Sequence, residues 1–210
     1  MTAAGDDPDQ EGRAGIGRIE AFSDGVVAII VTIMVLELHP PVAERFDILW
    51  SLWPVFLAYI LSYAFVAIYW VNHHRLFSYA RRVTNALLWA NILLLFTLSL
   101  VPFATAYLGE HHFSREATWL YLGAVLLPGI VYPWLQGIIR RTGRQDAAAL
   151  AYHLGTVRKG HIALGLYVAG LALTALSPWL GIACAGAVAI LWFLPSSGID
   201  RALARPRQGG

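Results

Sequence analysis

Long apolar stretches separated by short polar segments make up most of this chain. A helix needs about 20 mostly apolar residues to cross a membrane, and four such stretches occur before residue 140. A fifth stretch, residues 160–199, runs for forty residues without Asp, Glu, Lys or Arg. One helix of that length would be about twice the hydrocarbon thickness, so we expect it to fold back at Ser177-Pro178, where proline ends one helix and starts the next. The pattern predicts six spans, at approximately 19–38, 48–71, 86–108, 117–139, 160–177 and 179–198.

The composition agrees with a membrane protein. Of the 210 residues, 58% are hydrophobic and 13% are charged, whereas soluble domains carry about 25% charged residues. So few charges cannot coat a soluble globule, and a single cysteine, Cys184, excludes a disulfide scaffold. We therefore predict an all-α integral membrane protein with one transmembrane domain at 18–198. The polar ends, 1–17 and 199–210, are interpreted as disordered cytosolic tails.

Lys and Arg are unevenly distributed among the segments that flank the expected spans. Thirteen of them fall in the two tails and in the connections after the second and fourth spans, and only Arg45 and Arg115 fall in the other connections. Cytosolic segments carry the excess of Lys and Arg, so both termini are predicted to be cytosolic. Tryptophan favours the membrane–water interface, and four tryptophans mark the predicted outer ends: Trp50, Trp53, Trp119 and Trp179.

Among the expected spans, only the first contains acidic residues. An acid at the depth of Asp24 costs about 2.5–3.5 kcal/mol unless it finds a partner. Arg18 is about 120° away around the same helix, so Asp24 must reach another helix or subunit. We expect Asp24 and Ser23 to bond to the cytosolic end of the second span, with Arg18 closing the cluster. The candidate partners there are Trp70, Asn72, His73, His74 and Arg75. We interpret the cluster as a structural clamp, and a proton-transfer or ligand role for the histidines is the alternative.

One face of the first span repeats apolar residues at intervals of four and three. These residues are Phe22, Val26, Ile29, Ile33 and Leu36, with Thr32 beside them. Such spacing is typical of a helix packed on parallel neighbours, and periodicity alone favours ordinary packing, because apolar residues at helical spacing occur in any membrane helix. If copies of this helix surround an axis, rings of Ile29, Ile33 and Leu36 would form hydrophobic constrictions that gate by dewetting.

The segment Arg18-x-x-x-Phe22-Ser23-Asp24-Gly25 resembles the signature of the transmembrane protein 175 potassium channels. The segment that begins at His73-His74 resembles the part of that family after the second helix. The resemblance implies a structural role for these residues and for Trp70. It also implies that a single-repeat chain forms a homotetramer whose first helices line the pore. By the same resemblance Ile29 is the principal constriction, Thr32 contributes to selectivity, and Ile33 and Leu36 form further rings.

The resemblance therefore implies a potassium-permeable cation channel in the plasma membrane of a prokaryote. We expect passive conduction with modest selectivity for potassium over sodium, produced by hydrophobic rings, because the sequence contains no TVGYG-type carbonyl filter. The expected partners are the lipid bilayer, further copies of the chain and monovalent cations. We expect no nucleic acid, and no cofactor besides the permeant potassium ion.

Other classes fit the sequence less well. Ser23, Asp24 and His73 include the residue types of a hydrolytic triad, but no strand–turn–helix elbow holds the serine, so we predict that the protein is not an enzyme. His111-His112 without further ligands is weak evidence for a metal site, and none is predicted. A secondary transporter remains an alternative, because Pro128, Gly129 and Pro133 are able to break the fourth span. A non-conducting membrane scaffold is the second alternative.

Overall fold

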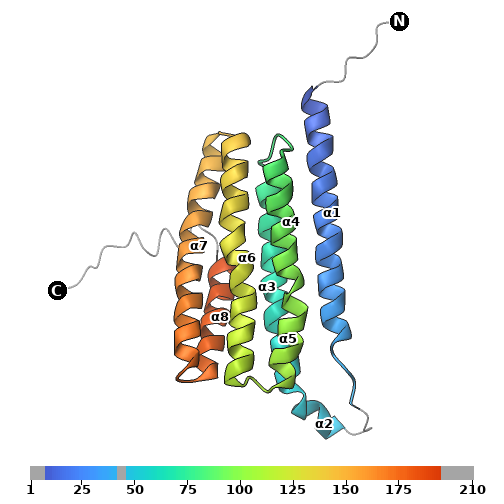
Figure 1. The fold of residues 1–210 in the computed structure, drawn as a ribbon, viewed down its shortest axis with the longest axis vertical. Coiled ribbons are helices and arrows are strands. Elements are labelled where there is room, and N and C mark those ends of the chain that lie inside the picture. Colours follow the sequence, from blue (N-terminus) through green and yellow to red (C-terminus); the bar gives the residue numbers. More distant parts are fainter. Residues whose placement is uncertain (1–7, 42–45, 195–210) are drawn as a thin grey trace, which may run out of the picture.

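The structure is a computed structural model that describes residues 8–41 and 46–194. These residues contain eight α-helices and no β-strand (Figure 1). The helices are α1 Pro8–Leu36, α2 Phe46–Ser51, α3 Trp53–Phe77, α4 Asn85–Ser99, α5 Val101–Glu110, α6 Arg115–Thr142, α7 Ala147–Thr174 and α8 Pro178–Phe193. The prediction of an all-α protein is confirmed.

Four of the helical segments are long and apolar enough to cross a membrane. They are Gly12–Leu36 in α1, α3, the pair α4–α5 taken together as Asn85–Glu110, and α6. The remaining two predicted spans correspond to α7, which carries Arg158 and Lys159 near its middle, and to α8, which is apolar but shorter. The structure thus supports a protein that crosses the membrane several times.

Helix α1 begins earlier than the sequence pattern predicted. It starts at Pro8, so the prediction of a disordered tail was wrong for residues 8–17, whereas residues 1–7 lie outside the described part of the chain. Proline is favoured in the first turn of a helix. Two glycines allow this added segment to pack closely, because a Cβ at Gly12 would lie 2.9 Å from the Arg81 carbonyl oxygen and one at Gly15 would lie 2.8 Å from the Val83 side chain.

Helix α7 also begins earlier, at Ala147 rather than at residue 160. The side chain of Asp146 caps its first turn by accepting a hydrogen bond of 2.8 Å from the Ala149 N–H, and alanine is the best helix former. Residues 147–159, which were predicted as part of a connection, are therefore helical. The predicted corner at Ser177-Pro178 is present between α7 and α8. Residues 195–198 and the predicted tail 199–210 lie outside the described residues.

Prolines affect two of the predicted spans differently. The predicted helix 86–108 divides into α4 and α5 at Leu100, because Pro102 has no N–H to continue the hydrogen-bond ladder. In contrast, α6 contains Pro128 and Pro133 and is nevertheless assigned as one helix. The broken fourth span that would favour a transporter is therefore not observed.

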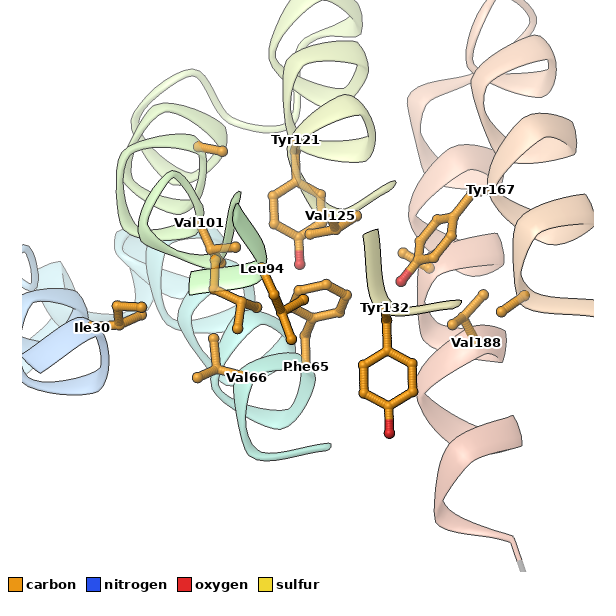
Figure 2. Close-up of a cluster of buried hydrophobic side chains, with 14 of the residues drawn as sticks. Ile30, Phe65, Val66, Leu94, Val101, Tyr121, Val125, Tyr132, Tyr167 and Val188 are labelled. Carbon is orange, nitrogen blue, oxygen red and sulfur yellow. The ribbon is translucent and has the colours of Figure 1, made fainter. Parts of the chain in front are cut away.

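Helix α1 lies at one edge of the bundle and α7 and α8 lie at the other (Figure 1). Helix α1 packs against α3, α4 and α5, while α6 joins that group to α7 and α8. A continuous buried core crosses all of these helices, from Ile30 on α1 through Val66 and Leu94 to Tyr121 on α6 and Val188 on α8 (Figure 2). This arrangement fixes one side of α1 against the bundle.

Candidate functional site

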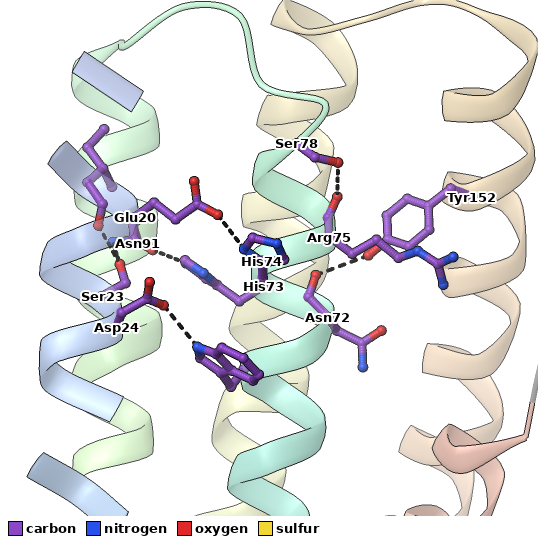
Figure 3. Close-up of polar contacts among 12 residues, drawn as sticks. Glu20, Ser23, Asp24, Asn72, His73, His74, Arg75, Ser78, Asn91 and Tyr152 are labelled. Atoms are coloured by element: carbon purple, nitrogen blue, oxygen red, sulfur yellow. Dashed lines mark hydrogen bonds and ion pairs between the residues drawn. The ribbon is translucent and has the colours of Figure 1, made fainter. Parts of the chain in front are cut away.

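A buried chain of hydrogen bonds joins α1, α4 and α3 near one end of the bundle (Figure 3). The Asn91 amide nitrogen donates to Ser23 Oγ at 2.9 Å, and the hydroxyl of Ser23 donates to the Ile19 carbonyl at 2.8 Å. The Asn91 amide oxygen lies 2.7 Å from His73 Nε2. Because that oxygen only accepts, His73 donates from Nε2. Ser23, Asn91 and His73 are all buried, so each satisfies polar groups that would otherwise be unpaired.

Two further contacts join α1 directly to α3. Trp70 Nε1 donates to Asp24 Oδ1 at 2.9 Å, and His74 Nδ1 lies 2.7 Å from Glu20 Oε1 (Figure 3). The rings of Trp70 and His74 stack with centroids 6.2 Å apart. Residues three and four apart share one face of a helix, so the contacting residues of α1 lie on one face of α1 and those of α3 lie on one face of α3. We call the seven residues of these contacts the anchor cluster: Glu20, Ser23 and Asp24 on α1, Trp70, His73 and His74 on α3, and Asn91 on α4.

The anchor cluster matches part of what the sequence predicted. Asp24 reaches Trp70 as expected, but Ser23 reaches His73 only through Asn91. Sequence reasoning missed Asn91, although a lone amide in an apolar helix is a signal for a buried polar contact. It also left Glu20 without a partner, and the structure pairs Glu20 with His74.

Three expected members of the cluster lie elsewhere. Asn72 lies beside α6 and α7, where its backbone carbonyl accepts hydrogen bonds from the hydroxyls of Tyr132 at 3.0 Å and Tyr152 at 3.2 Å. The Arg75 guanidinium lies 5.8 Å from the centre of the Tyr152 ring. Arg18 is exposed and forms no hydrogen bond or ion pair with the anchor cluster, because the helical rotation carries it to another side of α1. The expectation that Arg18 closes the cluster is not met.

The predicted pore residues are exposed at the surface of the chain, where Ile29 and Ile33 line an open groove together with Pro102 and Phe103 of α5. Ile29 is 58% exposed and Leu36 is 74% exposed, and Phe22, Thr32 and Ile33 are also exposed. The Thr32 hydroxyl donates to the Ile29 carbonyl at 2.9 Å. Ile30, the next residue and about 100° further around the helix, is only 3% exposed. We call the exposed set Phe22, Ile29, Thr32, Ile33 and Leu36 the outer stripe of α1.

Ser23 is not placed as a hydrolytic nucleophile, and the described residues hold no cluster suited to a metal ion. A catalytic serine needs its hydroxyl bonded to a histidine that takes the proton. The Ser23 hydroxyl instead donates to the Ile19 backbone carbonyl. No group of three or more His, Cys, Asp or Glu side chains in this part of the chain is placed to hold a metal ion. His111 lies against its own helix, with Nδ1 2.9 Å from the Tyr107 carbonyl oxygen.

Comparison with known proteins identifies the class. Residues 18–102 match the sequence model of the family described as endosomal/lysosomal potassium channel TMEM175. A potassium channel of Chryseobacterium sp. is 42% identical over 188 residues, which cover 89% of this chain and 97% of the relative. The crystal structure of a lysosomal potassium-selective channel TMEM175 homolog from Chamaesiphon minutus superposes with a TM-score of 0.69 at 36% identity and covers 87% of this chain and 98% of that one. The fold and the relatives define an ion-channel protein, not an enzyme.

The chain belongs to the TMEM175 family. The match extends to vertebrates over a shorter region, since the human endosomal/lysosomal proton channel TMEM175 is 38% identical over 111 residues. Those residues cover 47% of this chain and 22% of the human protein. The prokaryotic relative from Chryseobacterium sp. is named a potassium channel, and the human relative is named a proton channel.

Proposed function

We propose that this protein is a potassium-permeable cation channel of a prokaryotic plasma membrane. It conducts passively through a pore lined by α1 from each of four identical subunits. The observation that carries the proposal is the outer stripe, an apolar side of α1 that the rest of its own chain leaves exposed. An exposed apolar stripe on a helix at the edge of a bundle requires a lipid or protein neighbour. Further copies of α1 provide that neighbour and enclose an axis.

The chemistry of the outer stripe suits a weakly selective potassium pore. Ile29 forms the narrowest ring, and Ile33 and Leu36 form further rings at intervals of one helical turn. A permeating cation meets methyl groups there and sheds part of its hydration shell. Potassium is larger and more weakly hydrated than sodium, so this loss favours potassium modestly, without a carbonyl filter. The Thr32 hydroxyl supplies a polar layer between the apolar rings.

The anchor cluster sets the rotation of α1 about its own axis. Its contacts reach α1 from α3 and α4 on the side opposite to Ile29, so they hold the outer stripe away from the bundle. Gly25 is exposed on the same helix, and a Cβ added there would meet nothing within 4 Å inside the chain.

The placement of charged and aromatic residues supports six spans with both termini in the cytosol. The first turns of α1 lie at the same end of the bundle as the α3–α4 and α6–α7 connections, which contain Arg81, Arg82 and Arg144 (Figure 1). At the opposite end Trp53 stacks with Phe113 and Trp179, with ring centroids 6.0 Å and 5.7 Å apart. Basic residues favour the cytosolic side and tryptophans favour an interface.

Recording from the purified protein in planar bilayers tests the proposal. We expect unitary current steps and a reversal potential, between potassium on one side and sodium on the other, that shows preference for potassium. A secondary transporter would move ions without unitary steps, and a scaffold would carry no current. Repeating the measurement across a pH gradient separates potassium from protons, because a proton channel would follow the proton equilibrium potential.

Cross-linking tests the position of the outer stripe independently of conduction. Cys184 is first replaced by serine, and a cysteine is then introduced at Ile29. Intersubunit disulfides are expected to form at this position, because copies of α1 surround the axis. The matched control is Ile190→Cys, which is also an exposed isoleucine but lies on α8 at the other edge of the bundle. Cross-links through residue 190 alone would overturn the assignment of α1 to the axis.

A further inference from the structure

Two adjoining cavities lie between α3, α6, α7 and α8, on the opposite side of the bundle from α1. The inner cavity has a volume of about 300 Å³ and the outer one about 370 Å³. They share four lining residues, which are Ile68, Asn72, Thr156 and Trp192. The described residues of α1 line neither cavity, so this site is separate from the proposed ion path.

The wall of the inner cavity is mostly hydrocarbon. Phe65, Tyr167 and Val188 lie around it (Figure 2), together with residues of α6. The Asn72 side-chain amide on this wall donates to the Ile68 carbonyl at 2.7 Å, and the Tyr132 hydroxyl donates to the backbone carbonyl of Asn72. A wall with few polar groups left to bond holds ordered water poorly and accommodates an apolar ligand.

The outer cavity is cationic. Arg75 on α3 and Lys159 on α7 both line it, and Lys159 is only 6% exposed. The Lys159 ammonium donates to the Leu194 carbonyl and lies 5.6 Å from the centre of the Trp192 ring. Among the described residues, no carboxylate forms an ion pair with Arg75 or Lys159. A buried ammonium without an anionic partner is costly, so this pair of cations is suited to an anion that enters from outside.

We propose that the two cavities together bind one anionic phospholipid of the membrane. Its phosphate lies between Arg75 and Lys159 in the outer cavity, and one acyl chain enters the inner cavity past Ile68 and Trp192. A guanidinium and an ammonium bind phosphate through charge-assisted hydrogen bonds. Basic pockets between membrane helices at the cytosolic side bind anionic head groups. The proposal concerns a lipid site and does not depend on which ion the protein conducts.

Native mass spectrometry of the full chain in detergent tests this site by titration with phosphatidylglycerol, with phosphatidylcholine as the zwitterionic comparison. We expect phosphatidylglycerol to bind more tightly. Arg75→Gln and Lys159→Gln are each expected to weaken phosphatidylglycerol binding about fivefold, because each basic residue contributes about one kilocalorie per mole of attraction to an anionic head group. Phosphatidylcholine binding should change much less.

The inner cavity is tested by filling it. Gly160 lines the cavity, and a Cβ added there meets nothing within 4 Å, so Gly160→Leu fills space without a backbone clash. This variant should weaken binding of both lipids. Gly165→Leu is the matched control, because Gly165 is on the same helix, is equally open and lines neither cavity. Arg141→Gln removes an exposed charge near the same end of the bundle and controls for net charge.

The outcomes separate a lipid site from weaker explanations. If the control variants weaken phosphatidylglycerol binding as much as the cavity variants do, binding is nonspecific and the proposal is overturned. Glycerol 3-phosphate supplies the phosphate without acyl chains, and competition by it at the same concentration as the lipid would also overturn the proposal. Arg75 is exposed, so Arg75→Gln decides the matter even if Lys159→Gln fails to fold.

Discussion

The two sides of α1 both carry large apolar residues, yet these residues lie in different environments. Ile29 and Ile30 are neighbours, yet Ile29 is 58% exposed and Ile30 is 3% exposed. The inner side packs Ile30 and Met34 into the core and carries Ser23 of the anchor cluster. The outer side carries large apolar residues that the rest of the chain leaves exposed. The difference indicates that one helix joins the fold through one side and provides the proposed pore surface through the other.

The largest expected effect comes from a polar substitution on the inner side. Ile30→Asn buries an amide among apolar side chains and removes packing, which together should cost about 3–5 kcal/mol of folding stability. We expect little folded protein after extraction, measured as the monodisperse fraction in size-exclusion chromatography. Ile30→Val is the control and should cost about 0.5–1.5 kcal/mol. A normal yield of folded Ile30→Asn protein would contradict the assignment of the inner side.

The next effect concerns the bridge between α1 and α3. Asn91→Ala removes the amide that donates to Ser23 Oγ and accepts from His73 Nε2. Ser23 keeps its own bond to the Ile19 carbonyl, but the buried His73 N–H loses its acceptor, and a buried group left unpaired costs about 1–3 kcal/mol. The thermal midpoint of the variant should fall clearly below that of the unmodified protein. Ser99→Ala removes an exposed hydroxyl from the same helix and should leave the midpoint nearly unchanged. Equal midpoints for the two variants would show that the bridge contributes nothing to stability.

A smaller loss is expected from the contact between Asp24 and Trp70. Hydrogen bonds to charged groups contribute about 1.5–3 kcal/mol to stability. Because this hydrogen bond is open to solvent, Asp24→Ala should lower the free energy of unfolding by an amount at the lower end of that range. Trp70→Phe keeps an aromatic ring and removes only the N–H, so it should produce a similar shift in the thermal midpoint. A fully stable Asp24→Ala protein with altered ion preference would instead place Asp24 in the ion path.

Sequence reasoning recovered most of the fold because hydropathy reports which segments lie in hydrocarbon. It failed where helices continue into polar sequence. The starts of α1 at Pro8 and of α7 at Ala147 lie outside the apolar stretches, and a cap such as Asp146 marks a helix start better than hydropathy does. The division between α4 and α5 followed from Pro102, a local signal that the apolar pattern hides.

The anchor cluster could be predicted only in part. An acid inside an apolar span requires a partner, which correctly directed attention from Asp24 to the end of the second helix. The role of Asn91 depends on how three helices meet, and a pattern along one chain does not contain that information. For the same reason periodicity did not distinguish packing from an exposed stripe on α1, since apolar residues occur on both of its sides.

The last effect is the smallest in free energy and concerns the outer stripe. Ile29→Asn should leave the fold intact because residue 29 is exposed within the chain. In a ring of four, the amides would wet the constriction and supply oxygens that solvate sodium as well as potassium. Conductance should rise, and the permeability ratio of potassium to sodium should fall towards one. Even a tenfold change in that ratio corresponds to only about 1.4 kcal/mol, less than the cost predicted for Ile30→Asn.

The measurement is the reversal potential between potassium and sodium solutions in planar bilayers. Ile190→Asn makes the same change at an exposed isoleucine on α8 and should leave the reversal potential unchanged. If the Ile29 variant folds and its reversal potential also stays unchanged, Ile29 does not form the selective ring and another side of α1 must face the ion path.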